Sequence, residues 1–181
     1  FFIARESETA RNMIAEGLRD EDPDIRIQCL IVLGRPTVAT EWLIEEMLPY
    51  LEDPDSRVAE AAADAVCRAG LLPELVLPRV FEWGERGGRG AYKLPSNLSE
   101  YKQQLTPYMH RFGKFLDAEE TREGALDNLR WMLWDPDRPS FAPVLPYLHA
   151  LAVGDDAESA DKAVKLIESF NHREPRPEDE E

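Results

Sequence analysis

The chain has 181 residues and a formal net charge of −15, with 43% hydrophobic and 31% charged side chains. This length and apolar content suit one domain with a sizeable core. The negative charge disfavours nucleic acid as a partner and attracts cationic protein surfaces, although acidity can also serve only to keep a fold in solution. No apolar run approaches the roughly 18 residues that a membrane-spanning helix needs, so we predict no membrane partner.

The cysteines and histidines carry no recognisable metal or redox motif. Cys29 and Cys67 have no spacing of a metal site, and each of the three histidines lacks an acidic partner at metal-ligand spacing. We therefore predict no cofactor, no metal and no catalytic residue. Two cysteines that lie within predicted helices also favour a reducing, cytoplasmic location. The pattern places Cys29 in the core and Cys67 one residue off the apolar face of its helix.

The first third of the chain predicts three helices. Residues 8–19 have apolar side chains at helical spacing, and an acidic turn follows at 21–24. Residues 25–33 are apolar on nearly every side, which predicts a helix covered on both flanks; a short β-strand is the alternative because isoleucine and valine are β-branched. Thr40 is placed to cap a helix that runs to Leu48, and Pro49 should kink or stop it.

The segment 51–70, LEDPDSRVAEAAADAVCRAG, predicts the clearest helix of the chain. Asp55 or Ser56 can cap its start, and Gly70 can end it. A helix so rich in alanine buries little area and needs neighbours. Its predicted apolar face consists of Val58, Ala61, Ala62, Ala65, Val66 and Ala69.

The second half predicts a less regular series of helices. A segment from Pro73 to Trp83 precedes a long glycine- and arginine-containing loop at 84–99. Ser99 can cap a helix through Phe112, followed by helices at 119–134, 141–153 and 157–170, the last capped by Asp155 or Asp156. The acidic tail 173–181 is predicted to be disordered.

The same internal spacing recurs along the chain. Leu18 and Leu51 open two copies that lie 33 residues apart, and looser copies begin at Phe115 and Leu145. Self-similarity on this length scale is typical of stacked helical arrays. The corresponding positions are Ile25, Cys29, Val32 and Leu33; Val58, Ala62, Ala65 and Val66; Thr121, Ala125, Asn128 and Leu129; and Ser159, Ala163, Leu166 and Ile167.

This layout resembles the HEAT-repeat (armadillo-like) family. The residues that carry the resemblance are Leu51, Asp53, Pro54, Asp55, Val58, Ala62, Ala65 and Val66, and in the preceding copy Leu18, Asp20, Pro23, Asp24, Ile25 and Arg26. Many HEAT units carry an arginine at the position of Arg26, whereas the second copy has Ala59. The resemblance implies an all-α, right-handed solenoid over 1–172, with about four helix pairs, irregular in its second half. It also implies a role in binding macromolecules and no shared catalytic residue.

Within HEAT arrays the second helix of each pair lines the concave surface, and this resemblance selects the candidate binding residues. They are Glu60, Asp64, Arg68, Glu123, Asp127, Arg130, Trp131 and Trp134. The two tryptophans are either partner anchors on that surface or core side chains. The alternative for the charged residues is a solvated helix face. Charge reversal at Glu60, Asp64 and Asp127 is expected to weaken binding.

The sequence therefore predicts a non-catalytic protein–protein interaction scaffold whose acidic concave surface binds a basic segment of another protein. Two alternatives stay open. One is an enzyme or lyase subunit on a HEAT scaffold, of the bilin-lyase type. The other is a fragment of a larger structural solenoid, which the apolar start Phe1-Phe2 favours.

Overall fold

The computed structural model describes residues 13–14, 16–86, 94–135 and 137–172, and these residues contain helices and no strand. The β-strand alternative for 25–33 is therefore wrong, because α2 spans Pro23–Leu33. None of the described helices is long and apolar enough to cross a membrane. The chain divides into two compact units, residues 1–101 and 102–181, and each is described by itself.

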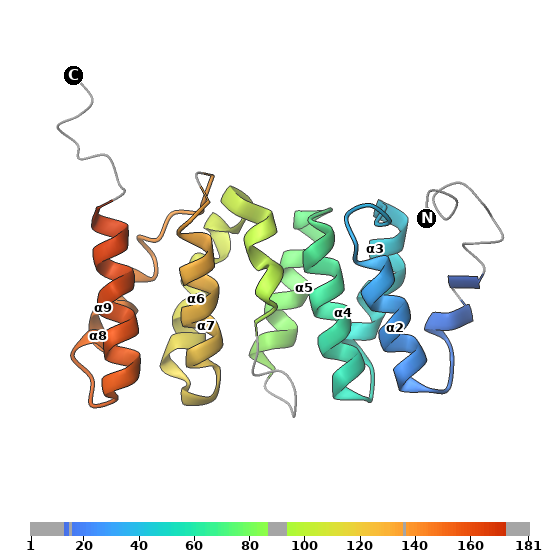
Figure 1. Cartoon of the computed structure of the whole chain (residues 1–181), viewed down its shortest axis with the longest axis horizontal. Coiled ribbons are helices and arrows are strands. Elements are labelled where there is room, and N and C mark those ends of the chain that lie inside the picture. The colour runs from blue at the N-terminus through green and yellow to red at the C-terminus, as the bar shows by residue number, and fades with distance from the viewer. Residues whose placement is uncertain (1–12, 15, 87–93, 136, 173–181) are drawn as a thin grey trace, which may run out of the picture. The chain divides into compact units, whose positions relative to one another are not determined.

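The N-terminal unit is a set of short helices in contact with one another (Figure 1). Helix α2 packs against α4, while the 3-10 helix η2 contacts α3, α4 and α5. The predicted helix at 8–19 lies mostly outside the described residues. After α2, the bounds of the elements are Glu41–Met47 for α3, Leu48–Glu52 for η2, Ser56–Ala69 for α4 and Pro73–Glu85 for α5.

Local chemistry fixes the ends of these helices. The carboxylates of Asp22 and Asp55 accept hydrogen bonds from the amides of Asp24 and Arg57, which caps α2 and α4. Gly70 ends α4 with φ of 63°, a left-handed conformation that glycine adopts without strain. These observations confirm the predicted cap by Asp55 and the predicted stop at Gly70.

Two expectations for α3 have different outcomes. Its α-helical stretch ends at Met47 and the chain continues as the 3-10 helix η2, so the predicted stop near Pro49 is confirmed. Thr40 occupies the N-cap position, but its hydroxyl makes no capping hydrogen bond. That part of the prediction is wrong.

Helix α4 forms the centre of the N-terminal core. Its buried set is wider than predicted, because Ala59, Ala63 and Cys67 are also buried, whereas Ala61 is half-buried. A Cβ on Gly34 would lie 2.5 Å from Cα of Ala65, so the end of α2 approaches the backbone of α4 as closely as glycine allows. The remaining buried residues of α4 are Val58, Ala62, Ala65, Val66 and Ala69.

Two predictions about burial need correction. Cys67 is fully buried and burial raises the pKa of its thiol well above the ordinary value, while Cys29 is only half-buried. In α2, only Leu30 and Leu33 are buried and Ile25 is 43% exposed. The helix is therefore not covered on both flanks; its main neighbour among the described elements is α4.

The C-terminal part of the chain differs from the sequence expectation at its first helix. Residues 96–108 form the 3-10 helix η3, Ser96–Tyr108, interrupted at Lys102 with φ of 49° and ψ of −125°. Ser99 lies inside η3 and does not cap an α-helix. The α-helix begins only at Met109, and Pro107 just before it disfavours an earlier start because it has no amide hydrogen and its ring clashes with a preceding carbonyl in an α-helix.

The predicted loop at 84–99 is shorter than expected at both ends. Gly84 and Glu85 belong to α5, and η3 begins at Ser96. Residues 87–93 of that loop, and the acidic tail 173–181, lie outside the described residues.

Within the C-terminal unit, four helices form two contacting pairs. They are α6 Met109–Asp117, α7 Glu119–Met132, α8 Leu145–Ala152 and α9 Ala157–Asn171. Besides the pairing of α6 with α7 and α8 with α9, the two first helices contact each other, as do the two second helices. The predicted start of α8 at Phe141 is wrong by four residues. Asp156 caps α9 through the amides of Glu158 and Ser159, as predicted.

The repeated spacing has a structural counterpart. All four marked positions are buried in α4, in α7 and in α9, whereas in α2 only Leu33 is. An arginine at one step recurs as well. Arg26 donates to Asp53 and to the carbonyls of Asp20 and Glu21.

Arg122 makes the corresponding contacts in the C-terminal unit. It donates to the carbonyls of Leu116 and Asp117 and lies 3.6 Å from the carboxylate of Asp156. Each of these two arginines therefore donates to carbonyls of the turn before its own helix and pairs with an aspartate of a later turn, Asp53 before α4 and the N-cap Asp156 of α9.

Candidate functional site

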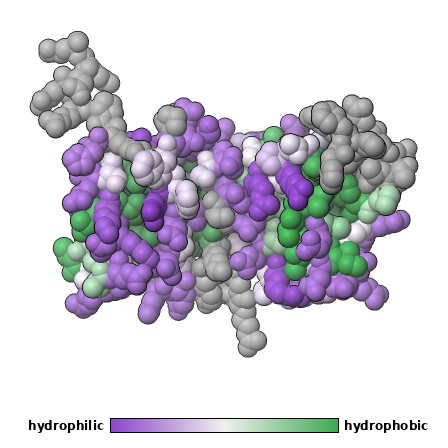
Figure 2. Space-filling view, in the orientation of Figure 1, coloured by the Kyte–Doolittle hydropathy of each residue, from purple (hydrophilic) through white to green (hydrophobic). Residues whose placement is uncertain are grey.

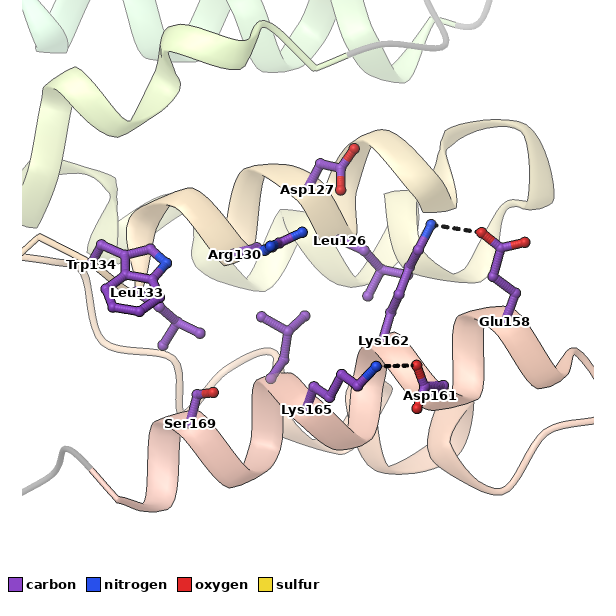
Figure 3. Close-up of a pocket in the computed structure, with 11 residues that line it drawn as sticks. Leu126, Asp127, Arg130, Leu133, Trp134, Glu158, Asp161, Lys162, Lys165 and Ser169 are labelled. Atoms are coloured by element: carbon purple, nitrogen blue, oxygen red, sulfur yellow. Dashed lines mark hydrogen bonds and ion pairs between the residues drawn. The ribbon is translucent and has the colours of Figure 1, made fainter.

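The second helices of the C-terminal unit enclose a pocket, which we name the α7–α9 pocket (Figure 3). Its volume is about 460 Å³, enough for one or two large side chains. Helices α7 and α9 contact each other, and residues of both line the pocket. It is lined by Leu126, Asp127, Arg130, Leu133, Trp134, Glu158, Asp161, Lys162, Lys165, Leu166 and Ser169.

The floor of the α7–α9 pocket is apolar. Leu126, Leu133 and Leu166 reach it from the two helices, and each is no more than 6% exposed. An apolar side chain placed on this floor would leave water without requiring any new polar partner.

Both candidate tryptophans are on the surface. Trp131 is 66% exposed and Trp134 is 68% exposed, which excludes the alternative that they are core side chains. Trp134 lines the α7–α9 pocket, whereas Trp131 does not. The sequence analysis assigned the two tryptophans the same role, whereas only Trp134 lines this pocket in the structure.

Lysines of α9 form ion pairs along the pocket. Lys162 lies 3.1 Å from Glu123 of α7 and 3.0 Å from Glu158 of its own helix. Hydrogen bonds to Glu158 and then Glu123 raise the pKa of Lys162 above its ordinary value. Lys165 pairs with Asp161 one turn away. Glu123 is therefore next to the pocket, because it forms an ion pair with Lys162, which lines it.

Asp127 and Arg130 are exposed and make no ion pair with any residue that the structure describes. They are one helical turn apart on α7. Figure 3 places Asp127 toward the end where Glu158 lies, and Trp134 at the opposite end near Ser169. Asp127 and Arg130, which form no ion pair with any described residue, therefore line the pocket with their charges exposed.

A smaller hollow of about 270 Å³ lies between α2 and α4 of the N-terminal unit. It brings together Glu60, Asp64 and Arg68, three predicted binding residues, with Ile31 of α2. Arg57 at its edge pairs with Asp24 and Asp55, 2.9 Å from each. Apolar surface is visible between polar side chains in this part of the molecule (Figure 2). Ala61 and Ala65 supply the rest of the lining.

Charge is balanced in both linings. The α7–α9 pocket has three carboxylates and three cations, and the α2–α4 hollow has two of each. Part of the acidic excess lies around the starts of the second helices, where carboxylates interact favourably with the helix dipole. These acidic residues include Asp20, Glu21, Asp22 and Asp24; Glu52, Asp53 and Asp55; Asp117, Glu119 and Glu120; and Asp155, Asp156 and Glu158.

Sequence reasoning missed the contribution of α9 to the site. Lys162, Lys165 and Leu166 face α7, but no pattern within 119–134 points to them. The repeat register contained part of the needed information, because α7 and α9 are both second helices and such helices pack together. Applied to the fourth copy, that register places Lys165 at the step of Asp127, but it does not select Lys162 as a pocket residue.

The described residues contain no group of three histidine, cysteine or acidic side chains able to hold a metal ion. The arrangement in the α7–α9 pocket offers an apolar floor, an exposed indole and a charged rim, which are features of a recognition site. Neither a family model, nor a curated protein, nor a solved structure matches this chain.

Proposed function

We propose that this protein is a non-catalytic scaffold that binds a basic segment of another protein in the cytoplasm. In this proposal the helix pairs stack as a right-handed, HEAT-like solenoid, and their second helices form the binding face. The stacking of α7 on α9 and of α6 on α8 supports this arrangement for the C-terminal unit. The two free cysteines fit a reducing compartment.

The observation that carries the proposal is the α7–α9 pocket. Tryptophan and arginine dominate the energetics of many protein interfaces, and Trp134 and Arg130 are both exposed beside an apolar floor. An isolated exposed tryptophan is common. Where a tryptophan forms the wall of a leucine-lined pocket, however, an inserted side chain can pack against both the indole and the leucines. That geometry favours a protein segment with an apolar anchor.

The charge of the protein favours a cationic partner. A net charge of −15 attracts basic surfaces at long range even where the pocket itself is balanced. The charge therefore increases the rate of encounter, while the leucines and Trp134 hold the bound segment. Binding should weaken with rising salt because the attraction is screened.

Site-specific photo-crosslinking tests the proposal. A benzophenone amino acid at position 165 lies in the α7–α9 pocket, and the same group at position 168 lies on an exposed part of α9 outside it. We expect a protein from native extract to be crosslinked from position 165 and not from 168, and to be competed away by unmodified protein. Equal crosslinking from both positions would refute the proposed surface.

A further inference from the structure

The α7–α9 pocket is electrically polarised along its length. Asp127 and Glu158 lie toward the same end of the pocket (Figure 3), and there Lys162 pairs with Glu158 and with Glu123 of α7. Arg130 lies further along α7, toward Trp134. A segment bound over the leucine floor therefore meets negative potential at one end and positive potential at the other.

Two charges carry most of this polarity. Lys162 and Lys165 are already paired with carboxylates, whereas Asp127 and Arg130 make no ion pair with any described residue. They are three residues apart on a helix, about 4.5 Å along its axis. Two side chains one turn apart on a bound partner helix can therefore reach both Asp127 and Arg130.

We infer that the α7–α9 pocket binds an amphipathic helix of a partner protein in one direction, antiparallel to α7 and α9. This inference rests on the proposed function. One apolar side chain of the bound helix occupies the floor beside Trp134, a lysine or arginine faces Asp127, and a carboxylate faces Arg130.

The direction follows from the helix dipole. A helix is stabilised by carboxylates near its N-terminus and by cations near its C-terminus. A bound helix with that common order brings its basic end to Asp127 only if it runs opposite to α7. In that direction its dipole also opposes those of α7 and α9, whereas the parallel direction would set like charges and aligned dipoles side by side.

A second copy of this chain is the competing occupant, because α7 itself has an acidic start and a basic end. The net charge of −15 on each copy opposes such self-association, whereas a cationic partner is attracted. The overall charge therefore favours a different protein over a second copy.

A displayed library of helical peptides of about four turns tests the inference on the full chain. Selection uses the wild-type protein, with counter-selection on Trp134→Ala. The best peptide is then synthesised in its selected charge order and with its acidic and basic ends exchanged. The matched protein variant carries Asp127→Arg and Arg130→Asp, which keeps the net charge; thermal unfolding checks that these two exposed substitutions leave the fold intact.

We expect the peptide with a basic C-terminal end to bind about tenfold more tightly than its exchanged form, and the charge-swapped protein to invert that preference. Equal binding of both peptides, with dependence on Trp134 retained, would overturn the direction and leave the proposed function standing. Failure to enrich any Trp134-dependent peptide would overturn both. A concentration-dependent dimer that is lost in Trp134→Ala would overturn the helical partner in favour of a second copy.

Discussion

Replacing Asp53 by alanine should destabilise the N-terminal unit strongly. Its carboxylate accepts hydrogen bonds from Nε and Nη2 of Arg26, at 3.1 and 3.0 Å, and from the amide of Asp55 at 2.9 Å. The side chains of Arg26 and Asp53 are only 13% and 6% exposed. Removing the acceptor leaves a nearly buried guanidinium without its counter-charge, which costs about 3 kcal/mol.

The double variant separates the lost pair from other effects of the substitution. In Arg26→Met with Asp53→Ala, no buried charge is left unpaired, so about 2 kcal/mol of the loss should be recovered. Asp24→Ala is the matched control, because Asp24 also joins α2 to an arginine of α4 but is 70% exposed. Its substitution should change the stability by little more than the error of the measurement.

The assay is urea denaturation followed by hydrogen exchange and mass spectrometry, which reports the free energy of opening for each helix. We expect faster exchange in α2 and α4 of Asp53→Ala and unchanged exchange in α9. If Asp53→Ala costs no more than Asp24→Ala, burial does not determine the strength of these ion pairs and the reasoning fails.

Two further predictions concern the C-terminal unit. Gly113→Ala should lower the stability of this unit by about 1–3 kcal/mol, since the new Cβ would lie 2.2 Å from the ring of Tyr147. Gly124→Ala should raise the stability by about 1 kcal/mol, because a Cβ there would have no neighbour within 4 Å. Calorimetry measures both changes. Hydrogen bonds from the Ser159 hydroxyl and amide lower the pKa of Asp156 below its ordinary 3.8, so its contribution is complete above about pH 5 and is lost as pH falls through the lowered value. Asp156→Asn should therefore flatten the fall in melting temperature between about pH 5 and 3, and an unchanged slope would contradict this.

Much of the helical structure could be predicted because local chemistry determines it. The side chains of Asp55 and Asp156 cap the starts of their helices and the backbone conformation of Gly70 ends α4, and these contacts span a few residues. The 3-10 helices could not be predicted in the same way. Pro107 disfavours an α-helix through this segment, but α5 accommodates Pro78, so the conformation that the chain adopts around a proline depends on packing.

The candidate site was only partly predictable for a related reason. Trp131 and Trp134 lie one turn apart, and a helical pattern alone does not say which flank of α7 meets α9. That flank is set by contacts between residues some thirty or more positions apart, such as Lys162 with Glu123. Sequence spacing therefore selected a helix that borders a pocket, and tertiary packing determined which of its side chains line that pocket.

Equilibrium titration with the partner crosslinked from position 165 tests the central claim most directly. Wild type is compared with Trp134→Ala and Trp131→Ala, two substitutions of equally exposed tryptophans of which only the first removes a wall of the α7–α9 pocket. We predict that Trp134→Ala raises the Kd at least about tenfold and that Trp131→Ala changes it less than about twofold. Similar effects of the two substitutions, or none, would contradict the assignment of the pocket as the binding surface.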